Sequence, residues 1–234
     1  MTCVAIIPAR GGSKRISGKN TRDFAGRPIM AYSIEAARAS GLFNRIIVSS
    51  DDQVIRETAV VCGAEAPFVR PPEISDDYAT TDAVIQHALG WLETNGTRPE
   101  YACCLYATAP FVVPDDLRRG FELLREKQAA TAFSVTTFPY SIFRALKLNE
   151  QGYLEMFWPE NRLKRSQELP TAWHDAGQFY WLDVRKYLGN PALFSKASIP
   201  VPLPRWQVQD IDTEEDWIRA ELMFRAINGN AGAE

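Results

Sequence analysis

Runs of apolar residues alternate with amphipathic stretches through the first 140 residues of the chain. The apolar runs have the length and composition of buried strands, and we expect strands at Thr2–Pro8, Arg45–Ser50, Tyr101–Tyr106 and Ala130–Thr136. The amphipathic stretches predict helices at Ile29–Ser40, Asp52–Cys62, Thr81–Thr94 and Pro114–Lys127. Strands that alternate with helices are typical of βα units. We therefore predict an α/β fold with a mostly parallel sheet flanked by helices.

The pattern changes after Phe138. Arg144–Asn149 and Tyr153–Trp158 flank a Glu150-Gln151-Gly152 turn, which predicts a β-hairpin. We interpret residues 139–170 as an inserted hairpin segment that protrudes from the sheet, within a single domain spanning residues 1–234. The main fold is expected to resume with strands at Gln178–Trp181 and Ser198–Leu203 and to close with a helix at Thr213–Ile227, where Thr213 and Asp216 have capping-box spacing.

Composition narrows the class of protein. A chain of 234 residues with 46% hydrophobic content is long enough for one large core, and its net charge of −3 argues against general nucleic-acid binding. No apolar stretch approaches the roughly 20 residues needed to cross a bilayer. We expect a cytoplasmic protein that binds neither nucleic acid nor membrane. The four cysteines lack metal-ligand spacing, so buried free thiols are the favoured interpretation.

A glycine-rich, basic loop follows the first predicted strand. Gly11 and Gly12 let backbone N–H groups approach a ligand, and Ser13 adds a hydroxyl donor. Against a single acid, Asp23, the stretch from Arg10 to Arg27 holds six cations: Arg10, Lys14, Arg15, Lys19, Arg22 and Arg27. Such a loop suits a phosphate chain, although its spacing excludes both the Walker-type loop and the dinucleotide fingerprint. The alternative is a solvated surface loop.

Two carboxylates precede the last predicted helix. In an extended segment, Asp210 and Asp212 share one face and can together hold a hard cation. Magnesium usually takes one or two protein carboxylates together with phosphate oxygens and water, so this pair complements the basic loop and predicts Mg²⁺ as the cofactor. The simpler alternative is that these residues only cap the helix.

Further polar candidates stand where predicted strands end. Thr108 follows the Tyr101–Tyr106 strand, at the sheet edge where ligands gather. Arg70 precedes a run of acidic and hydroxyl residues before the Thr81–Thr94 helix, and there Thr81 or Asp82 is equally well explained as a helix N-cap. Beyond the hairpin stand Arg165, Gln167, Asp175, Gln178 and Phe179. The run that holds Arg165 and Gln167 is explained either as a solvated charged edge or as part of a ligand site, since arginine can capture a carboxylate and amides can bind hydroxyl and acylamino groups. A resemblance to a known family implies the second explanation, with a sugar as the ligand.

The run from Ile7 to Arg15, followed by Gly18-Lys19-Asn20, resembles the signature of the cytidylyltransferases that activate nine-carbon keto acids, sialic acid and its relatives, as CMP sugars. The resemblance covers nearly the whole chain and implies a Rossmann-like nucleotidyltransferase fold. It implies CTP contacts at Arg10, Gly12, Ser13, Lys14, Arg15, Lys19, Asn20, Arg70 and Thr108. The catalytic residues would be Lys14, Arg15, Lys19, Asp210 and Asp212, the last two as metal ligands.

The resemblance also bears on the sugar. The sialic acid branch usually has a Gln-Pro-Thr-Ser-Pro-like run where this chain has Tyr106-Ala107-Thr108-Ala109-Pro110, and His174–Trp181 resembles the pseudaminic acid branch. We therefore expect CTP and a nonulosonic acid, pseudaminic acid in the first place, as substrates. Sialic acid, legionaminic acid and KDO are alternatives, and a non-catalytic nucleotide-sugar-binding protein is the alternative from another class. The family commonly dimerises through the insertion, which implies a homodimer.

Overall fold

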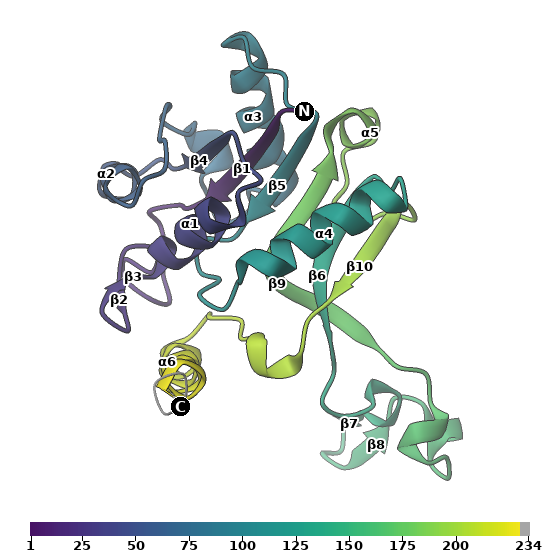
Figure 1. The fold of residues 1–234 in the computed structure, drawn as a ribbon. Coiled ribbons are helices and arrows are strands. Elements are labelled where there is room, and N and C mark those ends of the chain that lie inside the picture. The colour runs from purple at the N-terminus through teal and green to yellow at the C-terminus, as the bar shows by residue number, and fades with distance from the viewer. Residues whose placement is uncertain (230–234) are drawn as a thin grey trace.

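The computed structural model describes residues 1–229, so residues 230–234 of the expected domain lie outside the described part. A six-stranded sheet forms the centre of the molecule (Figure 1). Its strands, in spatial order, are β10 (Ser198–Pro202), β6 (Thr131–Thr137), β9 (Trp173–Asp183), β5 (Tyr101–Leu105), β1 (Cys3–Pro8) and β4 (Arg45–Ser49). Neighbouring strands pair in parallel except β9, which is antiparallel to both β5 and β6. The predicted α/β fold with a mostly parallel sheet is confirmed.

Helices cover both faces of this sheet. Apolar side chains of α1 (Ile29–Ser40), α2 (Gln53–Val61) and α4 (Pro114–Glu126) pack into one core cluster. Those of α3 (Thr81–Thr94) and α5 (Val184–Gly189) pack into a second cluster on strands of the same sheet. Strands buried on two faces explain why the sequence shows continuous apolar runs instead of strict alternation.

The helix ends are fixed by local hydrogen bonds. Asp52 caps α2, and the Thr213–Asp216 capping box forms as predicted at the start of α6 (Glu214–Gly229), where each residue accepts from the other's backbone N–H. The cap of α3 is Thr80, which accepts from the Ala83 N–H, and neither Thr81 nor Asp82 takes that position. Both side chains are thereby left for other partners.

Several short elements differ from the sequence prediction. Strand β9 begins at Trp173, five residues before the predicted start at Gln178, because its first residues pair with β6 around an irregularity between Phe133 and Val135. The short helix α5 and the two-residue strands β2 (Asp23–Phe24) and β3 (Arg27–Pro28) had no counterpart in the prediction. Short 3₁₀ turns lie at Pro72–Ile74, Ile142–Arg144, Pro159–Asn161, Ser166–Glu168 and Arg205–Gln207.

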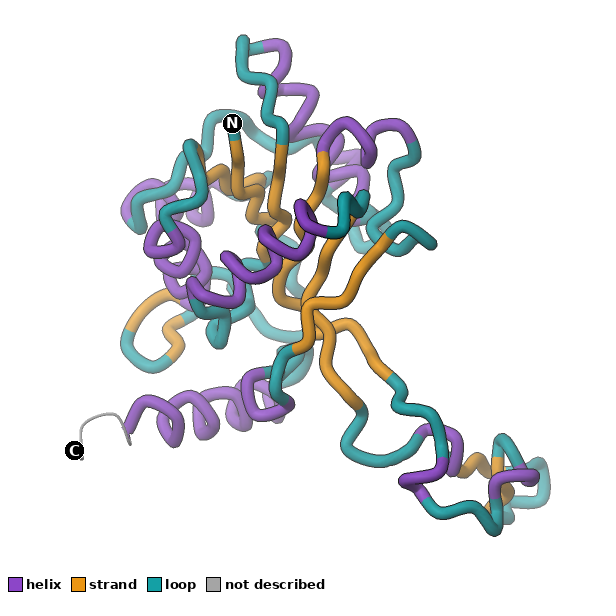
Figure 2. Tube along the Cα trace, turned by 45° about the vertical axis from the view of Figure 1, so that its right-hand side comes forward, coloured by secondary structure: helices purple, strands orange, loops and turns teal. Residues whose placement is uncertain are grey.

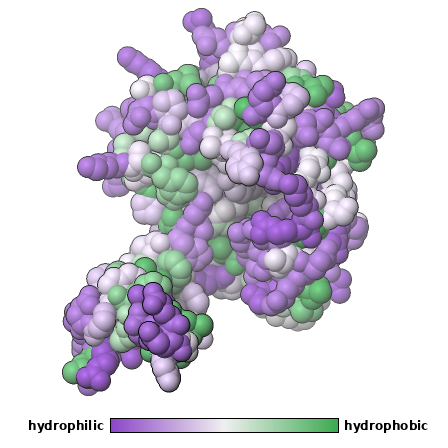
Figure 3. Space-filling model, turned by 180° about the vertical axis from the view of Figure 1, so that it is seen from behind, coloured by the Kyte–Doolittle hydropathy of each residue, from purple (hydrophilic) through white to green (hydrophobic). Residues whose placement is uncertain are grey.

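Residues 139–170, here called the protruding segment, extend away from the sheet (Figure 2). Strands β7 (Leu146–Leu148) and β8 (Leu154–Met156) pair antiparallel within it, as the turn residues predict. Asn149 closes the turn, because its carboxamide oxygen accepts from the backbone N–H groups of Gln151 and Tyr153. Apolar side chains are scattered over this segment among polar ones (Figure 3).

None of the helices in residues 1–229 combines the length and apolar character that a bilayer crossing requires. The four cysteines are free thiols, and Cys3, Cys103 and Cys104 are buried. Burial raises the pKa of Cys3 to about 12, so this thiol stays protonated at neutral pH.

Candidate active site

A cavity of about 660 Å³ opens where β1 and β5 end at their carboxyl edge. This is the edge at which α/β proteins bind ligands. Its wall is formed by the basic loop, the segment before α3, the exit of β5 and one residue before α6: Pro8, Arg10, Ser13, Lys14, Arg15, Lys19, Asn20, Arg70, Ile74, Asp76, Asp77, Ala79, Thr81, Val84, Tyr106, Ala107, Thr108 and Asp212.

The basic loop is held by backbone contacts and by one close approach. The Gly11 N–H donates to the Asp51 carboxylate at 3.0 Å, and the Asn20 carboxamide donates to the Arg10 carbonyl at 2.9 Å. A Cβ at Gly11 would lie 2.8 Å from the Asp52 Cβ, whereas a Cβ at Gly12 would meet nothing within 4 Å. The requirement for glycine is therefore steric at Gly11, where the loop passes the start of α2.

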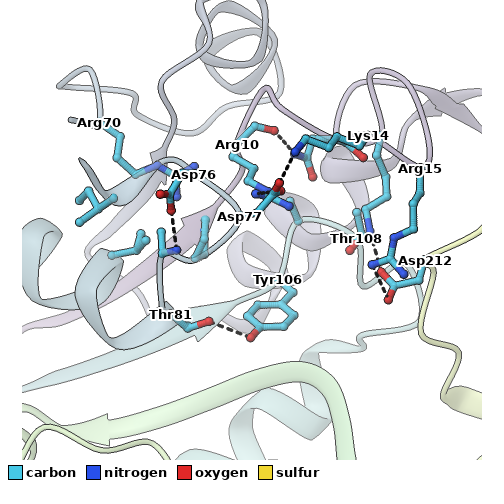
Figure 4. Close-up of a pocket in the computed structure, with 18 residues that line it drawn as sticks. Arg10, Lys14, Arg15, Arg70, Asp76, Asp77, Thr81, Tyr106, Thr108 and Asp212 are labelled. Carbon is cyan, nitrogen blue, oxygen red and sulfur yellow. Dashed lines mark hydrogen bonds and ion pairs between the residues drawn. The ribbon is translucent and has the colours of Figure 1, made fainter. Parts of the chain in front are cut away.

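Two cations of the cavity, Arg10 and Lys14, share the carboxylate of Asp77. Arg10 Nη1 lies 2.6 Å from one oxygen of this carboxylate, and Lys14 Nζ lies 2.5 Å from the other (Figure 4). The hydrogen bonds from Lys14 and Arg10 lower the pKa of Asp77. Asp77 thus contributes a negative charge directly to the predicted phosphate-binding loop.

A second pair of cations contacts Asp212. Arg15 Nη2 lies 2.9 Å and Lys19 Nζ 3.5 Å from its carboxylate, and Lys19 also donates to the Ile211 carbonyl at 2.6 Å. Asp210 stands two residues earlier. Burial is the largest cause that raises its pKa, and the negative charge of Asp212 raises it further. The two carboxylates are therefore close enough to repel each other.

Arg70 forms part of the cavity wall at the other end of the pocket, where Figure 4 shows it with Asp76 and Thr81, apart from Lys14, Arg15 and Asp212. Only 3% of Arg70 is exposed, and among the described residues its Nε has no hydrogen-bond acceptor. Its nearest carboxylate oxygen, on Asp51, is 3.6 Å from Nη2. Burial lowers the pKa of Arg70, and a buried guanidinium with an unused donor favours an acceptor on a ligand.

Most residues predicted to bind the nucleotide meet in this cavity. All of the predicted CTP contacts except Gly12 line it, and Asp212 lines it as well. Asp210 lies beside the cavity without lining it. Residues far apart in sequence, from the first loop to Asp212 before the last helix, thus meet in one cavity.

The predicted sugar-side residues lie elsewhere. None of the five, all in the described part of the chain, lines this cavity. Arg165 and Gln167 are exposed on the protruding segment. On β9, Gln178 is buried and donates to the Gln207 carbonyl at 2.6 Å, and Asp175 accepts from Gly177 and Tyr180. Phe179 is fully buried in the core, so its side chain has no exposed surface for a ligand. The apolar residues that follow it in the sequence already indicated a buried strand.

Two acidic residues near the basic loop had not been predicted as part of the site. Asp51 stands two residues after the end of β4, at the same sheet edge as the loop, and this position after a strand was a usable signal. Asp77 stands in an irregular segment with several neighbouring acids and hydroxyls, and nothing in its local pattern distinguishes it from Asp76. Asp76 instead stabilises its own turn by accepting from the Tyr78 and Ala79 N–H groups.

Comparisons with known proteins place this chain in a family. The family model for cytidylyltransferases matches residues 4–200. A pseudaminic acid cytidylyltransferase of Campylobacter jejuni is 43% identical over 99% of this chain and 100% of its own length. A CMP-N,N'-diacetyllegionaminic acid synthase of Legionella pneumophila is 28% identical over 96% and 97% of the two chains. A solved CMP-2-keto-3-deoxy-manno-octonic acid synthetase complexed with CTP shares the fold, with a TM-score of 0.69, 17% identity and coverage of 97% and 99%.

Proposed function

This chain belongs to the cytidylyltransferase family, and from that premise we propose that it condenses CTP with pseudaminic acid to give the CMP-sugar and pyrophosphate. The family makes it a nucleotidyltransferase. The full-length similarity to a pseudaminic acid cytidylyltransferase supports the choice of sugar.

The observation that carries the proposal is the division of the cavity into two ends. One end holds Arg10, Lys14, Arg15 and Lys19, a set of cations that suits a triphosphate. The other holds buried Arg70 together with Thr81 and Tyr106, and the Nε of Arg70 has no acceptor among the described residues. An elongated ligand with an anionic chain and a polar aromatic base, such as CTP, matches both ends.

The reaction follows from these parts. The anomeric hydroxyl oxygen of the sugar forms a bond to the α-phosphorus of CTP as the bond from that phosphorus to the bridging oxygen breaks. Pyrophosphate leaves with the bonding electrons, and the hydroxyl proton passes to solvent. Because such transfers place negative charge on oxygens, fixed cations do most of the catalysis. Lys14, Arg15 and Lys19 would stabilise that charge, while Arg10 and Ser13 hold the phosphates.

A magnesium ion fits the residues present. Asp210 and Asp212 offer carboxylate oxygens, and the mutual repulsion that raises the Asp210 pKa would be relieved by a cation. Within residues 1–229 no cluster of three or more ligating side chains forms, so phosphate oxygens and water would complete the coordination. When bound, the ion would neutralise phosphate charge and lower the pKa of the attacking hydroxyl.

We further propose that the protein acts as a cytoplasmic homodimer through the protruding segment. Its exposed apolar side chains provide area for association: Leu146, Leu148, Tyr153, Leu154, Phe157 and Leu163. Arg165 and Gln167 lie on this segment and not at the cavity of their own chain, which supports a role at the sugar held by a second copy. Free buried thiols are consistent with a reducing compartment.

The direct test is an assay with CTP, Mg²⁺ and a panel of keto acids: pseudaminic, legionaminic and sialic acids and KDO. Pyrophosphate release and product mass would be measured for each sugar. We expect the highest kcat/KM with pseudaminic acid. Release with another sugar at higher kcat/KM would transfer the assignment to that substrate, and no release with any sugar would refute the enzymatic proposal.

A further inference from the structure

The segment that carries the two carboxylates before α6 is anchored on its downstream side by that helix. The Asp212 N–H donates to Asp216 Oδ2 at 3.2 Å, and the Thr213 N–H donates to the same oxygen at 2.9 Å. Ile211 is 1% exposed and packs in a core cluster with Trp217 of α6. The position of Asp212 is therefore set by the first turn of the last helix.

Asp210 lies on the other side of Ile211, and the chain before it is anchored to the sheet. Three residues before Asp210, the carbonyl of Gln207 accepts a hydrogen bond from the Gln178 carboxamide at 2.6 Å. Gln178 belongs to β9 and is 3% exposed. Its own carbonyl accepts from the Tyr106 N–H at 2.9 Å, so the same residue contacts the exit of β5 at the cavity wall.

The side chain of Gln207 forms the second anchor of this segment. Its Nε2 lies 3.1 Å from the Phe111 carbonyl oxygen and 2.5 Å from Asp116 Oδ2, in the first turn of α4. A carboxamide nitrogen carries two hydrogens, so both are used within the protein. Only 5% of Gln207 is exposed. The contacts therefore join β9, α4 and the chain before Asp210 in one buried cluster.

Asp210 requires such an anchor because it stands close to a like charge. Burial, and then the charge of Asp212, raises the pKa of Asp210, so the two carboxylates repel each other in the empty site. This repulsion pushes Asp210 away from Asp212, and a backbone held on the upstream side resists that movement. Partners behind metal ligands that fix their orientation are a general requirement for tight metal binding.

We propose that Gln178 and Gln207 are positioning residues for Asp210, and that they hold its carboxylate where one divalent cation can contact it together with Asp212. The proposal rests on the proposed function, because it takes the two carboxylates as the metal ligands. Neither glutamine touches the ion, since both act through the backbone of the segment. Gln178, which the sequence predicted at the sugar, is thereby assigned to the metal side of the site.

The experiment measures how strongly a metal ion tightens the binding of CTP, a quantity here called the metal effect. Dissociation constants for CTP are determined by calorimetry with Mn²⁺, which takes the same kind of oxygen ligands as Mg²⁺, and without metal. Gln178→Met and Gln207→Met keep the length of the side chain and remove its hydrogen bonds. We expect the metal effect to fall about tenfold in both variants. CTP affinity without metal should be unchanged, since neither glutamine lines the cavity.

A pair of substitutions assigns the effect to one contact. Gln207→Glu places a second carboxylate against Asp116 and should reduce the metal effect as Gln207→Met does. Adding Asp116→Asn gives the new carboxylate a donor and should restore at least part of the metal effect. Amide hydrogen exchange of residues 208–211 in the empty protein should be faster in Gln178→Met and Gln207→Met, and this readout requires neither metal nor turnover.

The matched control is Thr131→Val. Thr131 is fully buried on β6, donates to the Leu193 carbonyl at 3.1 Å and does not line the cavity. Its replacement should lower stability and leave the metal effect unchanged. An unchanged metal effect in folded Gln178→Met and Gln207→Met would overturn the proposal, and so would an equal fall in Thr131→Val. If Mn²⁺ does not tighten CTP binding by the wild type, the metal site of the proposed function is refuted, and this proposal with it.

Discussion

The Arg15 guanidinium lies 2.9 Å from the Asp212 carboxylate, so a residue of the first loop is ion-paired with one that precedes the last helix. Lys19 approaches the same carboxylate and the neighbouring Ile211 carbonyl. The contact joins the predicted phosphate-binding and metal-binding parts of the site in one place. Under the proposed function, Arg15 would exchange this carboxylate for phosphate oxygens of the nucleotide, and Asp212 would then be free for a cation.

Replacing Asp210 or Asp212 by Ala should reduce kcat by about 10²-fold or more, because several kcal/mol of charge stabilisation would be lost with the cation. The affinity for CTP measured without metal should not fall in Asp212→Ala, since Arg15 and Lys19 lose a competing carboxylate. Steady-state kinetics and metal-free calorimetry check the two parts. Glu215→Gln, an exposed change in the first turn of α6, is the control; metal-independent wild-type turnover would contradict the role assigned to both carboxylates.

Asp77→Asn should strengthen CTP binding several-fold. The carboxylate now holds Arg10 and Lys14, and its removal leaves both cations free for the phosphates. The effect should shrink as ionic strength rises, because exposed charges are screened by salt. Glu73→Gln removes an exposed acid from the same segment and controls for net charge. Weaker binding of CTP by Asp77→Asn would mean that the carboxylate organises the basic loop and does not compete with the phosphates for its cations.

The same ion pairs predict how stability depends on pH. Because the pKa of Asp77 is lowered in the folded chain, the unfolded chain binds its proton at higher pH, and this group stabilises the fold above its unfolded pKa of about 3.9. The stabilisation is lost as pH falls through the lower, folded pKa. Urea unfolding of wild type and Asp77→Asn should therefore differ at pH 7 and converge below pH 4. A difference in the free energy of unfolding that grows as the pH falls would contradict this prediction.

Gly11 and Gly12 should respond differently to a methyl group. Gly11→Ala forces a Cβ to within 2.8 Å of Asp52, the cap of α2, and should destabilise the protein by about 1–3 kcal/mol. Gly12→Ala meets open space and should change the free energy of unfolding by no more than about 0.5 kcal/mol. Denaturant titration of the two variants checks this difference. Equal losses of stability would show that the loop is not seated against α2 as described.

Charge placed on the protruding segment should disrupt the proposed dimer. Leu148→Glu with Leu154→Glu introduces two carboxylates among exposed apolar side chains of the β7–β8 hairpin, so association would require burying them. Light scattering after size-exclusion chromatography should show a shift to monomer. Val61→Glu changes an exposed valine on α2, outside the protruding segment, and should leave the mass unchanged. A wild-type protein that is monomeric at all concentrations would refute the dimer itself.

The sequence predicted the parts of this molecule whose local signals agree with the fold. Strands β1 and β5 are buried along nearly their whole length, so their apolar runs are unambiguous, and α1 and α3 have the predicted bounds. Strand β9 was predicted too short because its first residues, from Trp173 to Gly177, are half polar and extended only through pairing with β6. Tertiary pairing decided that segment, and no local pattern could reveal it.

The candidate site was also predictable from the sequence only in part. Arg10 to Asn20 could be read from glycine, charge and position after a strand, because each of these has a direct physical link to phosphate binding. The partners of Asp77 could not, since Arg10 and Lys14 stand 67 and 63 residues before it and only the folded chain brings them together. Phe179 was misjudged for a different reason, because the apolar run from Phe179 to Leu182 already indicated a buried strand.

The pairing of Thr137 with Trp173 at the base of the protruding segment has one more consequence. These residues are direct neighbours on adjacent antiparallel strands, so the entire segment is, in topological terms, the loop of one long hairpin. Such a loop can be shortened or exchanged without changing the order of the strands in the sheet. The entropy of closing the loop changes only slowly with its length. No residue of 139–170 lines the cavity, so we expect a short-turn replacement of this segment to fold and to keep the cavity intact.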